Sequence, residues 1–237
     1  YGYFRGQIDP YTHHYKTGAR TWHRNDQLLD EPGHATDLIA AEAIRVIRSA
    51  GDKPFFLYTA FSVPHYPLSE PSEWTSLYDG EIEDRWRKLN AASISHMDDA
   101  IGRIVETLEE SGLRENTLIV FTSDNGGQQS WNAPASQYEG RYEPHTTLGN
   151  NLPLRGWKTQ LYEGGIRVPC CVNWPGCVPS GKIIDDPVCI IDWMPTFLEL
   201  VGRPGDESDG LSGRSIWPLI LSDVEPQQRT FYWRTPG

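Results

Sequence analysis

A carboxylate and a carboxamide stand side by side in this 237-residue sequence, at Asp124 and Asn125. They come shortly after the apolar run 118–122 and directly before Gly126 and Gly127. The two glycines let the backbone turn tightly while both side-chain oxygens point to one place. All-oxygen ligands of this kind suit a hard cation such as Ca²⁺ or Mg²⁺. The same residues also form good turns, so a plain turn stays open as the alternative.

Two further side chains could take part in chemistry. His65 lies between Pro64 and Pro67, which present it rigidly after the apolar run 55–61. A lone histidine in such a place is often structural. Lys158 carries a positive charge, although a lone lysine is by default a solvated surface residue. Taken alone, neither residue establishes whether its role is structural or functional.

Hydrophobic periodicity indicates the elements that must position these residues. It predicts helices over 36–51, 94–112 and 190–201 and strands over 55–61, 118–122 and 166–172. Alternating helices and buried strands are typical of an α/β fold with a mainly parallel sheet. In such sheets the chemistry lies beyond the carboxyl ends of the strands, where both His65 and Asp124 fall.

The segments between these elements are expected to be loops. The first thirty residues are aromatic and histidine-rich but aperiodic, which indicates a surface loop region. The stretch 128–150 is polar and rich in Gly, Asn and Pro. Long loops of this kind in a compact domain usually serve function.

Composition excludes some classes of protein. Lys and Arg number 21 against 32 Asp and Glu, so the formal net charge is −11, which disfavours nucleic-acid binding. No apolar run approaches the roughly 18–20 residues of a membrane-spanning helix. The four cysteines are expected to be buried thiols, with a disulfide as the open alternative. Because the sequence opens Tyr1-Gly2 without an initiator Met, we interpret it as an internal fragment.

Several motifs occur together and in a fixed order. They are FTSDNGG at 121–127, GNNLPLRGWK at 149–158 and EGGIRVP at 163–169, with MDDAIG at 97–102 and IDWMPT at 191–196. The combination closely resembles the type I sulfatases of the alkaline-phosphatase-like superfamily, and is nearest in look to arylsulfatase B-type enzymes. The resemblance covers essentially the whole chain. It implies a three-layer sandwich with a mainly parallel central sheet, truncated at its N-terminal side.

The resemblance also implies roles for the candidate residues. Asp124 and Asn125 would be two ligands of one Ca²⁺ ion, with two further ligands upstream, and His65 and Lys158 would contact the sulfate. A sulfate ester spreads negative charge over three oxygens, so a metal and cations aimed at them stabilise the transition state. His65 would protonate the leaving alcohol as general acid, while Lys158 would hold sulfate as a point charge.

The family's nucleophile is a formylglycine made from Cys, rarely Ser, within Cys-x-Pro-x-Arg. Residues 177–181 (CVPSG) look like this motif, but Gly181 replaces the Arg and the segment follows the metal pair instead of preceding it. We interpret it as a coincidental surface turn and expect the modified residue upstream of Tyr1. Asp98 and Asp99 are not expected to replace the missing ligands, because consecutive acids in a helix point to different faces.

The sequence thus predicts that residues 1–237 are a fragment of a sulfatase catalytic domain, without its nucleophile-bearing N-terminal part and its small C-terminal domain. The intact protein would hydrolyse sulfate esters of a sulfated glycan or an aryl sulfate, whereas the fragment alone would be inactive. The alternatives are a phosphodiesterase or phosphonate hydrolase of the same superfamily, and a non-catalytic protein that binds sulfated polysaccharides. The resemblance places the protein in a secreted, periplasmic or lysosomal compartment.

Overall fold

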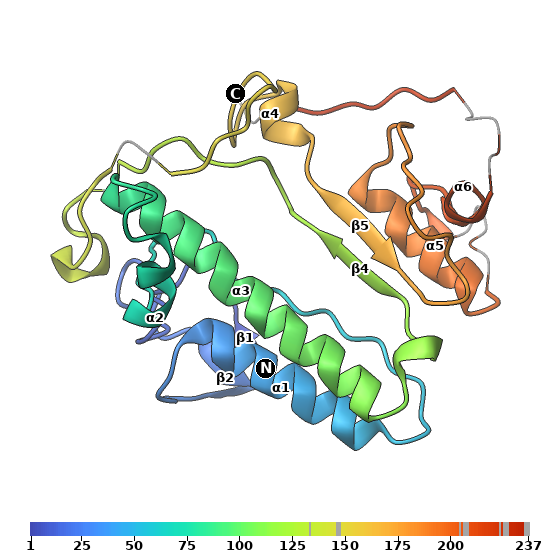
Figure 1. Cartoon of the computed structure of the whole chain (residues 1–237), viewed down its shortest axis with the longest axis horizontal. Coiled ribbons are helices and arrows are strands. Elements are labelled where there is room, and N and C mark those ends of the chain that lie inside the picture. The colour runs from blue at the N-terminus through green and yellow to red at the C-terminus, as the bar shows by residue number, and fades with distance from the viewer. Residues whose placement is uncertain are drawn as a thin grey trace.

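Two long helices form one side of the molecule. In the computed structural model, α1 (Ala35–Ala50) and α3 (Arg85–Glu110) pack against each other along their lengths (Figure 1). The structure describes residues 1–132, 134–145, 148–203, 205, 209–222, 224 and 228–234. The shorter elements are β1 (Gly2–Tyr3), β2 (Trp22–Arg24), β3 (Gln27–Leu28), α2 (Ser72–Thr75), η1 (Ser76–Tyr78), η2 (Arg114–Asn116), β4 (Ile119–Thr122), η3 (Gln137–Gly140), α4 (Glu163–Ile166), β5 (Cys170–Asn173), η4 (Ile190–Asp192), α5 (Trp193–Leu200) and α6 (Trp217–Leu221).

Local sequence features explain where both long helices begin and end. Helix α1 begins after His34, whose ring accepts a hydrogen bond from the Thr36 backbone N–H. It ends at Gly51, where φ is 56°. Helix α3 begins after Asp84, whose carboxylate caps the first turn, and Gly112 follows it with φ 67°. The two predicted helices are therefore confirmed, and α1 starts at Ala35, one residue before the predicted 36.

The paired strands depart from the predicted parallel sheet. Strand β4 pairs with β5 in antiparallel register, with Val120 opposite Val172. The expectation of a mainly parallel sheet is thus wrong for the strands of the described residues, which are all paired antiparallel. Residues 55–61 are extended but pair with no strand in the described chain. Phe56 and Tyr58 are 75% and 83% exposed, so this run is not a strand buried on both faces.

The N-terminal region is folded, contrary to the expected surface loop. Strands β1, β2 and β3 form a small antiparallel sheet, with His23 opposite both Gly2 and Leu28. Trp22 is only 1% exposed and packs with Ile8 against the start of α1. Strands this short carry no readable period, so aromatic burial, not alternation, holds this region together.

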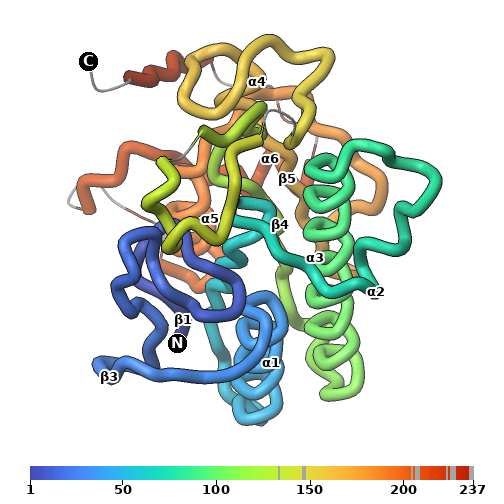
Figure 2. The backbone as a smooth tube through the Cα atoms, turned by 90° about the vertical axis from the view of Figure 1, so that its left-hand side faces the viewer, coloured from blue at the N-terminus to red at the C-terminus, as the bar shows by residue number. Residues whose placement is uncertain are grey.

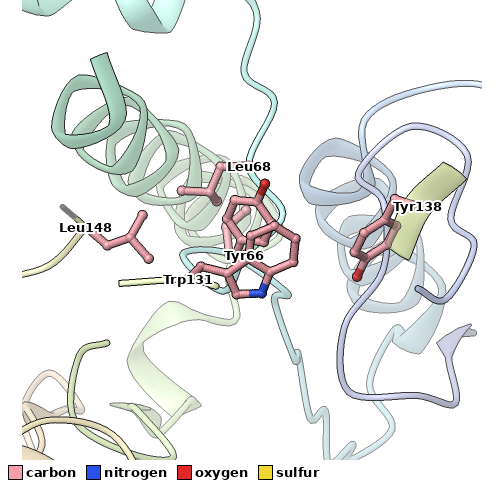
Figure 3. Close-up of a cluster of buried hydrophobic side chains, with 6 residues drawn as sticks. Tyr66, Leu68, Trp131, Tyr138 and Leu148 are labelled. Carbon is pink, nitrogen blue, oxygen red and sulfur yellow. The ribbon is translucent and has the colours of Figure 1, made fainter. Parts of the chain in front are cut away.

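A second core cluster joins segments that are far apart in sequence. It contains Tyr66, Leu68, Trp131, Tyr138 and Leu148, labelled in Figure 3, together with Val63. The rings of Tyr66 and Trp131 lie with centroids 3.6 Å apart. The segment that carries His65 is therefore packed directly against the 128–148 loop.

Helices α5 and α6 cover the other side of the β4–β5 pair (Figures 1 and 2). Trp193, Ile216 and Ile220 form their buried cluster, against which Val120 and Val172 pack. The predicted third helix is confirmed as η4 followed by α5. Among the described residues, no helix has both the length and the apolar character that crossing a lipid bilayer requires.

The cysteines are free thiols, as the sequence interpretation favoured, but they are not buried. Cys170, Cys171 and Cys177 are exposed and Cys189 is half-buried. Cys170 and Cys171 are consecutive in β5 and point to opposite faces of the two-stranded pair, so both of its faces are open to solvent at this place.

Candidate functional site

Asp124 and Asn125 follow β4 directly, where the chain leaves the β4–β5 pair. Asp124 is exposed and Asn125 is half-buried. The Asn125 Nδ2 donates to the Gly126 carbonyl at 3.0 Å, which leaves Oδ1 as an acceptor. Within the described residues, neither the Asp124 carboxylate nor Asn125 Oδ1 has a hydrogen-bond or ion-pair partner. The pair therefore presents two side-chain oxygens that remain available to a ligand.

Glycines bring three loops into backbone contact beside this pair. The Gly126 N–H donates to the Gly165 carbonyl at 3.0 Å. A Cβ at Gly126 would lie 1.8 Å from the Gly164 carbonyl oxygen, and a Cβ at Gly164 would lie 2.2 Å from that of Gly156. No side chain fits at such distances. The glycines of 126–127 and 163–165 are required because these loops touch.

Asn151 fastens the same loops through its side chain. Its Oδ1 accepts from the Gly127 N–H at 3.0 Å, and its Nδ2 donates to the carbonyls of Gly127 and Gly156 at 2.9 and 3.1 Å. The Lys158 N–H donates to the same Gly127 carbonyl at 3.0 Å. Asn151 therefore fixes the backbone that carries Lys158. Figure 2 shows these segments gathered at one end of the molecule, around α4.

His65 and Lys158 line one cavity of about 360 Å³. The other lining residues are Gln7, Gln128, Gln129, Ser130, Trp131, Trp157, Thr159 and Gln160. Two predicted site residues that stand 93 positions apart in the sequence thus share one space. Asp124 and Asn125 do not line the cavity themselves, but the negative charge of Asp124 acts on the pKa of His65.

The state of His65 follows from its surroundings. Its Nδ1 donates to the Tyr66 carbonyl at 2.6 Å, which leaves Nε2 as the free nitrogen. Burial lowers the pKa of His65, and the positive charge of Lys158 lowers it further, whereas Asp124 opposes the shift. The ring is therefore neutral at pH 7 in the empty cavity. An anion placed between His65 and Lys158 would favour the imidazolium.

Several cavity residues could not be assigned a role from the sequence. Gln7 comes from the N-terminal region, and Trp157 and Thr159 flank Lys158. Thr159 has φ 75°, an unfavourable conformation for a β-branched residue. Strain of this kind is often found at functional sites. A backbone angle is not readable from the residue type, so this feature could not be predicted from the sequence.

A larger surface hollow of about 550 Å³ lies on the α1 side, away from these residues. It is lined by Ala41, Ile44, Arg45, Arg48, Ser49 and Arg103. All three arginines are already ion-paired with carboxylates of α1 or α3. This hollow therefore lacks the unpaired groups of the His65–Lys158 cavity.

The remaining sequence candidates lie elsewhere. Cys177 belongs to a turn in which its N–H donates to the Trp174 carbonyl, and it does not line the cavity. Asp98 and Asp99 are exposed on α3, where Asp99 pairs with Arg103 at 3.0 Å.

A family model described as sulfatase matches residues 1–203 of the chain. The chain belongs to the sulfatase family. Mouse steryl-sulfatase is 31% identical over 202 residues, which are 84% of this chain and 30% of that protein. Mouse arylsulfatase J is 35% identical over 168 residues, 71% of this chain and 25% of that protein. The narrower resemblance to arylsulfatase B-type enzymes stays a prediction.

Solved structures show the same sulfatase fold. The crystal structure of Ps i-CgsB in complex with k-i-k-neocarrahexaose is 31% identical to this sulfatase, with a TM-score of 0.78. The match covers 92% of this chain and 48% of that one. The chain spans about half of this solved structure and about a third or less of the two curated relatives.

The residues after β4 fit a hard cation. Asp124 and Asn125 offer one carboxylate and one amide oxygen, both without partners in the described chain, and no nitrogen or sulfur ligand. Ca²⁺ prefers this donor set. The two residues would supply part of its coordination shell, and the ion would stabilise negative charge on the oxygens of a bound sulfate.

Proposed function

We propose that this chain is the part of a sulfuric ester hydrolase that binds the sulfate group and protonates the leaving alcohol. The observation that carries the proposal is the shared cavity of His65 and Lys158, beside the unpaired oxygens of Asp124 and Asn125. Together they offer positive charge, a proton donor and hard-cation ligands to one tetrahedral anion.

The nucleophile, a formylglycine in this proposal, lies in a part of the protein outside these 237 residues. The family's Cys-x-Pro-x-Arg motif does not occur in the sequence. The N-terminal part that carries it and a small C-terminal domain would complete the catalytic domain. We place the complete protein in a secreted, periplasmic or lysosomal compartment, and expect residues 1–237 alone to be inactive.

The chain's own residues would act in two ways. Lys158 holds the sulfate as a point charge. Its backbone N–H and the side chain of Asn151 both bond to the Gly127 carbonyl, which fixes the segment that carries the lysine side chain. His65 donates from Nε2 once the bound anion has raised its pKa, and its Nδ1 contact with the Tyr66 carbonyl holds the ring in place. The alcohol oxygen leaves with that proton.

The walls of the cavity favour a sugar as the alcohol. Trp131 and Trp157 offer aromatic surface, and Gln7, Gln128 and Gln129 offer amide groups that bond with hydroxyls. A carbohydrate chain has both apolar C–H faces and many hydroxyls. The complex of the similar protein Ps i-CgsB with k-i-k-neocarrahexaose supports this substrate class. We therefore propose a sulfated polysaccharide, with an aryl sulfate as a simpler substrate.

The test uses the complete protein and three substrates: a sulfated polysaccharide, nitrophenyl sulfate and a nitrophenyl phosphodiester. We expect sulfate release, with Asp124→Ala losing both bound calcium and activity and Asp98→Ala losing neither. The two variants are matched because both acids are exposed, but only Asp124 follows β4.

Other outcomes of this test would support the alternative functions. Faster cleavage of the phosphodiester than of the sulfate would show a phosphodiesterase or phosphonate hydrolase. Tight polysaccharide binding with no release of sulfate would show a binding protein. Equal loss in Asp124→Ala and Asp98→Ala would contradict the assigned metal ligands.

A further inference from the structure

Two histidines and two carboxylates meet between α1, α3 and the segment before α2. His34 caps α1, Asp37 lies in its first turn, His96 comes from α3 and Glu70 precedes α2. Ligand atoms of His34, Asp37 and His96 all lie within 4.8 Å of one another. His96 Nε2 is 3.2 Å from Asp37 Oδ2, and His34 Nε2 is 3.6 Å from Glu70 Oε1.

This cluster is buried and contains unpaired polar atoms. The side chains of His34, His96 and Glu70 are 2%, 2% and 0% exposed. Even so, His34 Nε2 and Glu70 Oε1 have no hydrogen-bond partner. Buried polar groups are nearly always paired, and an ion that the coordinates do not contain is one physical explanation when they are not.

We propose that His34, Asp37 and His96 bind a divalent cation of the zinc class, with Glu70 holding His96 in place from outside the coordination shell. Imidazole and carboxylate ligands are typical of zinc, with bonds of about 2.0–2.2 Å and hence ligand atoms about 3.3 Å apart in a tetrahedron. The 3.2 Å between His96 Nε2 and Asp37 Oδ2 is close to that value, and the ligand atoms of all three residues lie within 4.8 Å of one another. The site differs in donor type from the all-oxygen pair after β4.

Outer contacts already orient the proposed ligands. Glu70 Oε2 accepts from His96 Nδ1 at 2.7 Å, which turns His96 Nε2 toward Asp37. The other oxygen of Asp37 accepts from Arg103 at 2.7 Å. Metal-bound histidines and carboxylates are usually held by such second hydrogen bonds.

Metal binding has one structural consequence at His34. The ring's Nδ1 accepts from the Thr36 N–H at 3.2 Å, so the proton of the neutral ring is on Nε2. A metal on Nε2 moves that proton to Nδ1, and helix α1 loses this long capping contact. In return, one ion would tie α1, α3 and the segment before α2 together.

The experiment is a zinc titration of the chelator-treated protein by calorimetry, with thermal unfolding measured in parallel. The free cysteines are alkylated first, because exposed thiols also bind zinc. We expect one zinc per chain and a higher unfolding temperature with zinc. His34→Gln should abolish binding, and Glu70→Gln should weaken it by about 10- to 100-fold. His145→Gln is the matched control, since His145 is equally buried but lies among aromatic rings.

Two measurements on the unsubstituted protein, the absorption of bound cobalt and NMR of the histidine rings, keep the proposal testable if a variant does not fold. Cobalt bound to the unsubstituted protein should show tetrahedral ligand-field absorption without a thiolate charge-transfer band. Zinc should move the His34 proton from Nε2 to Nδ1. The proposal is overturned if the unsubstituted protein binds no zinc, if His34→Gln binds it as tightly, or if the His34 proton stays on Nε2 at saturating zinc.

Discussion

Replacing Gly126 by alanine should separate the loops that carry the site. The added Cβ would stand 1.8 Å from the Gly164 carbonyl oxygen, where a normal contact is about 3.5 Å. The two backbones must therefore move apart by more than about 1 Å, and the Gly126–Gly165 hydrogen bond at 3.0 Å is lost. Overpacking costs about 1–3 kcal/mol, and a lost hydrogen bond about 1 kcal/mol. We expect the free energy of unfolding to fall by about 2–4 kcal/mol.

In Gly126→Ala, the loss of activity should be larger than the loss of stability alone would cause. A displacement of about 1 Å in a positioned group can reduce the rate by about 100-fold. Urea denaturation gives the stability, and sulfate release by the complete protein gives kcat/KM. Gly102→Ala is the control, because Gly102 lies within α3 and a Cβ there meets no atom within 4 Å. Wild-type stability and activity in Gly126→Ala would refute the contact between these loops.

Three further predictions concern charges. Lys158→Ala should weaken sulfate binding and raise the pKa of His65, which NMR can follow. Lys158→Arg should restore the low pKa of His65 but little activity. Near-full activity of the Arg variant would show that Lys158 acts only as a general surface charge. His65→Ala should reduce kcat/KM on a sulfated sugar by about 10²–10⁴-fold but far less on nitrophenyl sulfate, whose leaving group needs no proton, and equal losses would exclude an acid role. Hydrogen bonds from Arg24 and Arg45 lower the pKa of Glu42 to about 2. Glu42→Gln should therefore lower the free energy of unfolding by about 1 kcal/mol at pH 7, a value discounted because the arginines are exposed to solvent. In urea unfolding experiments, the difference in stability between wild type and Glu42→Gln should vanish as pH falls from about 4.5 to about 2.

The sequence predicts those parts of the fold that depend on local rules. Both long helices end near a glycine, Gly51 and Gly112, and a glycine that terminates a periodic pattern is readable. Strand β4 is also found where the apolar run 118–122 predicts it. Strand β5 overlaps the predicted strand 166–172, but its antiparallel pairing with β4 is not readable, because the paired residues lie far apart in the chain.

The site was predictable only in part. Asp124, Asn125, His65 and Lys158 stand out by type and by motif, whereas Gln7 enters the cavity only through the folding of the N-terminal region. The sequence showed the paired glycines but not that they serve loop-to-loop contact. The buried histidines of α1 and α3 lie on different helices, so no spacing rule links them.

The extended segment 55–61 has a consequence for how the protein behaves at high concentration. Its backbone pairs with no strand in the described chain, and Phe56 and Tyr58 point two large rings toward solvent. Phe56 meets α5 in an edge contact with the ring of Phe197, with ring centroids 5.7 Å apart. An unpaired strand with exposed aromatic side chains is a template for self-association. Aggregation of this chain should therefore start at residues 55–61, and a peptide of that sequence should either seed or block it.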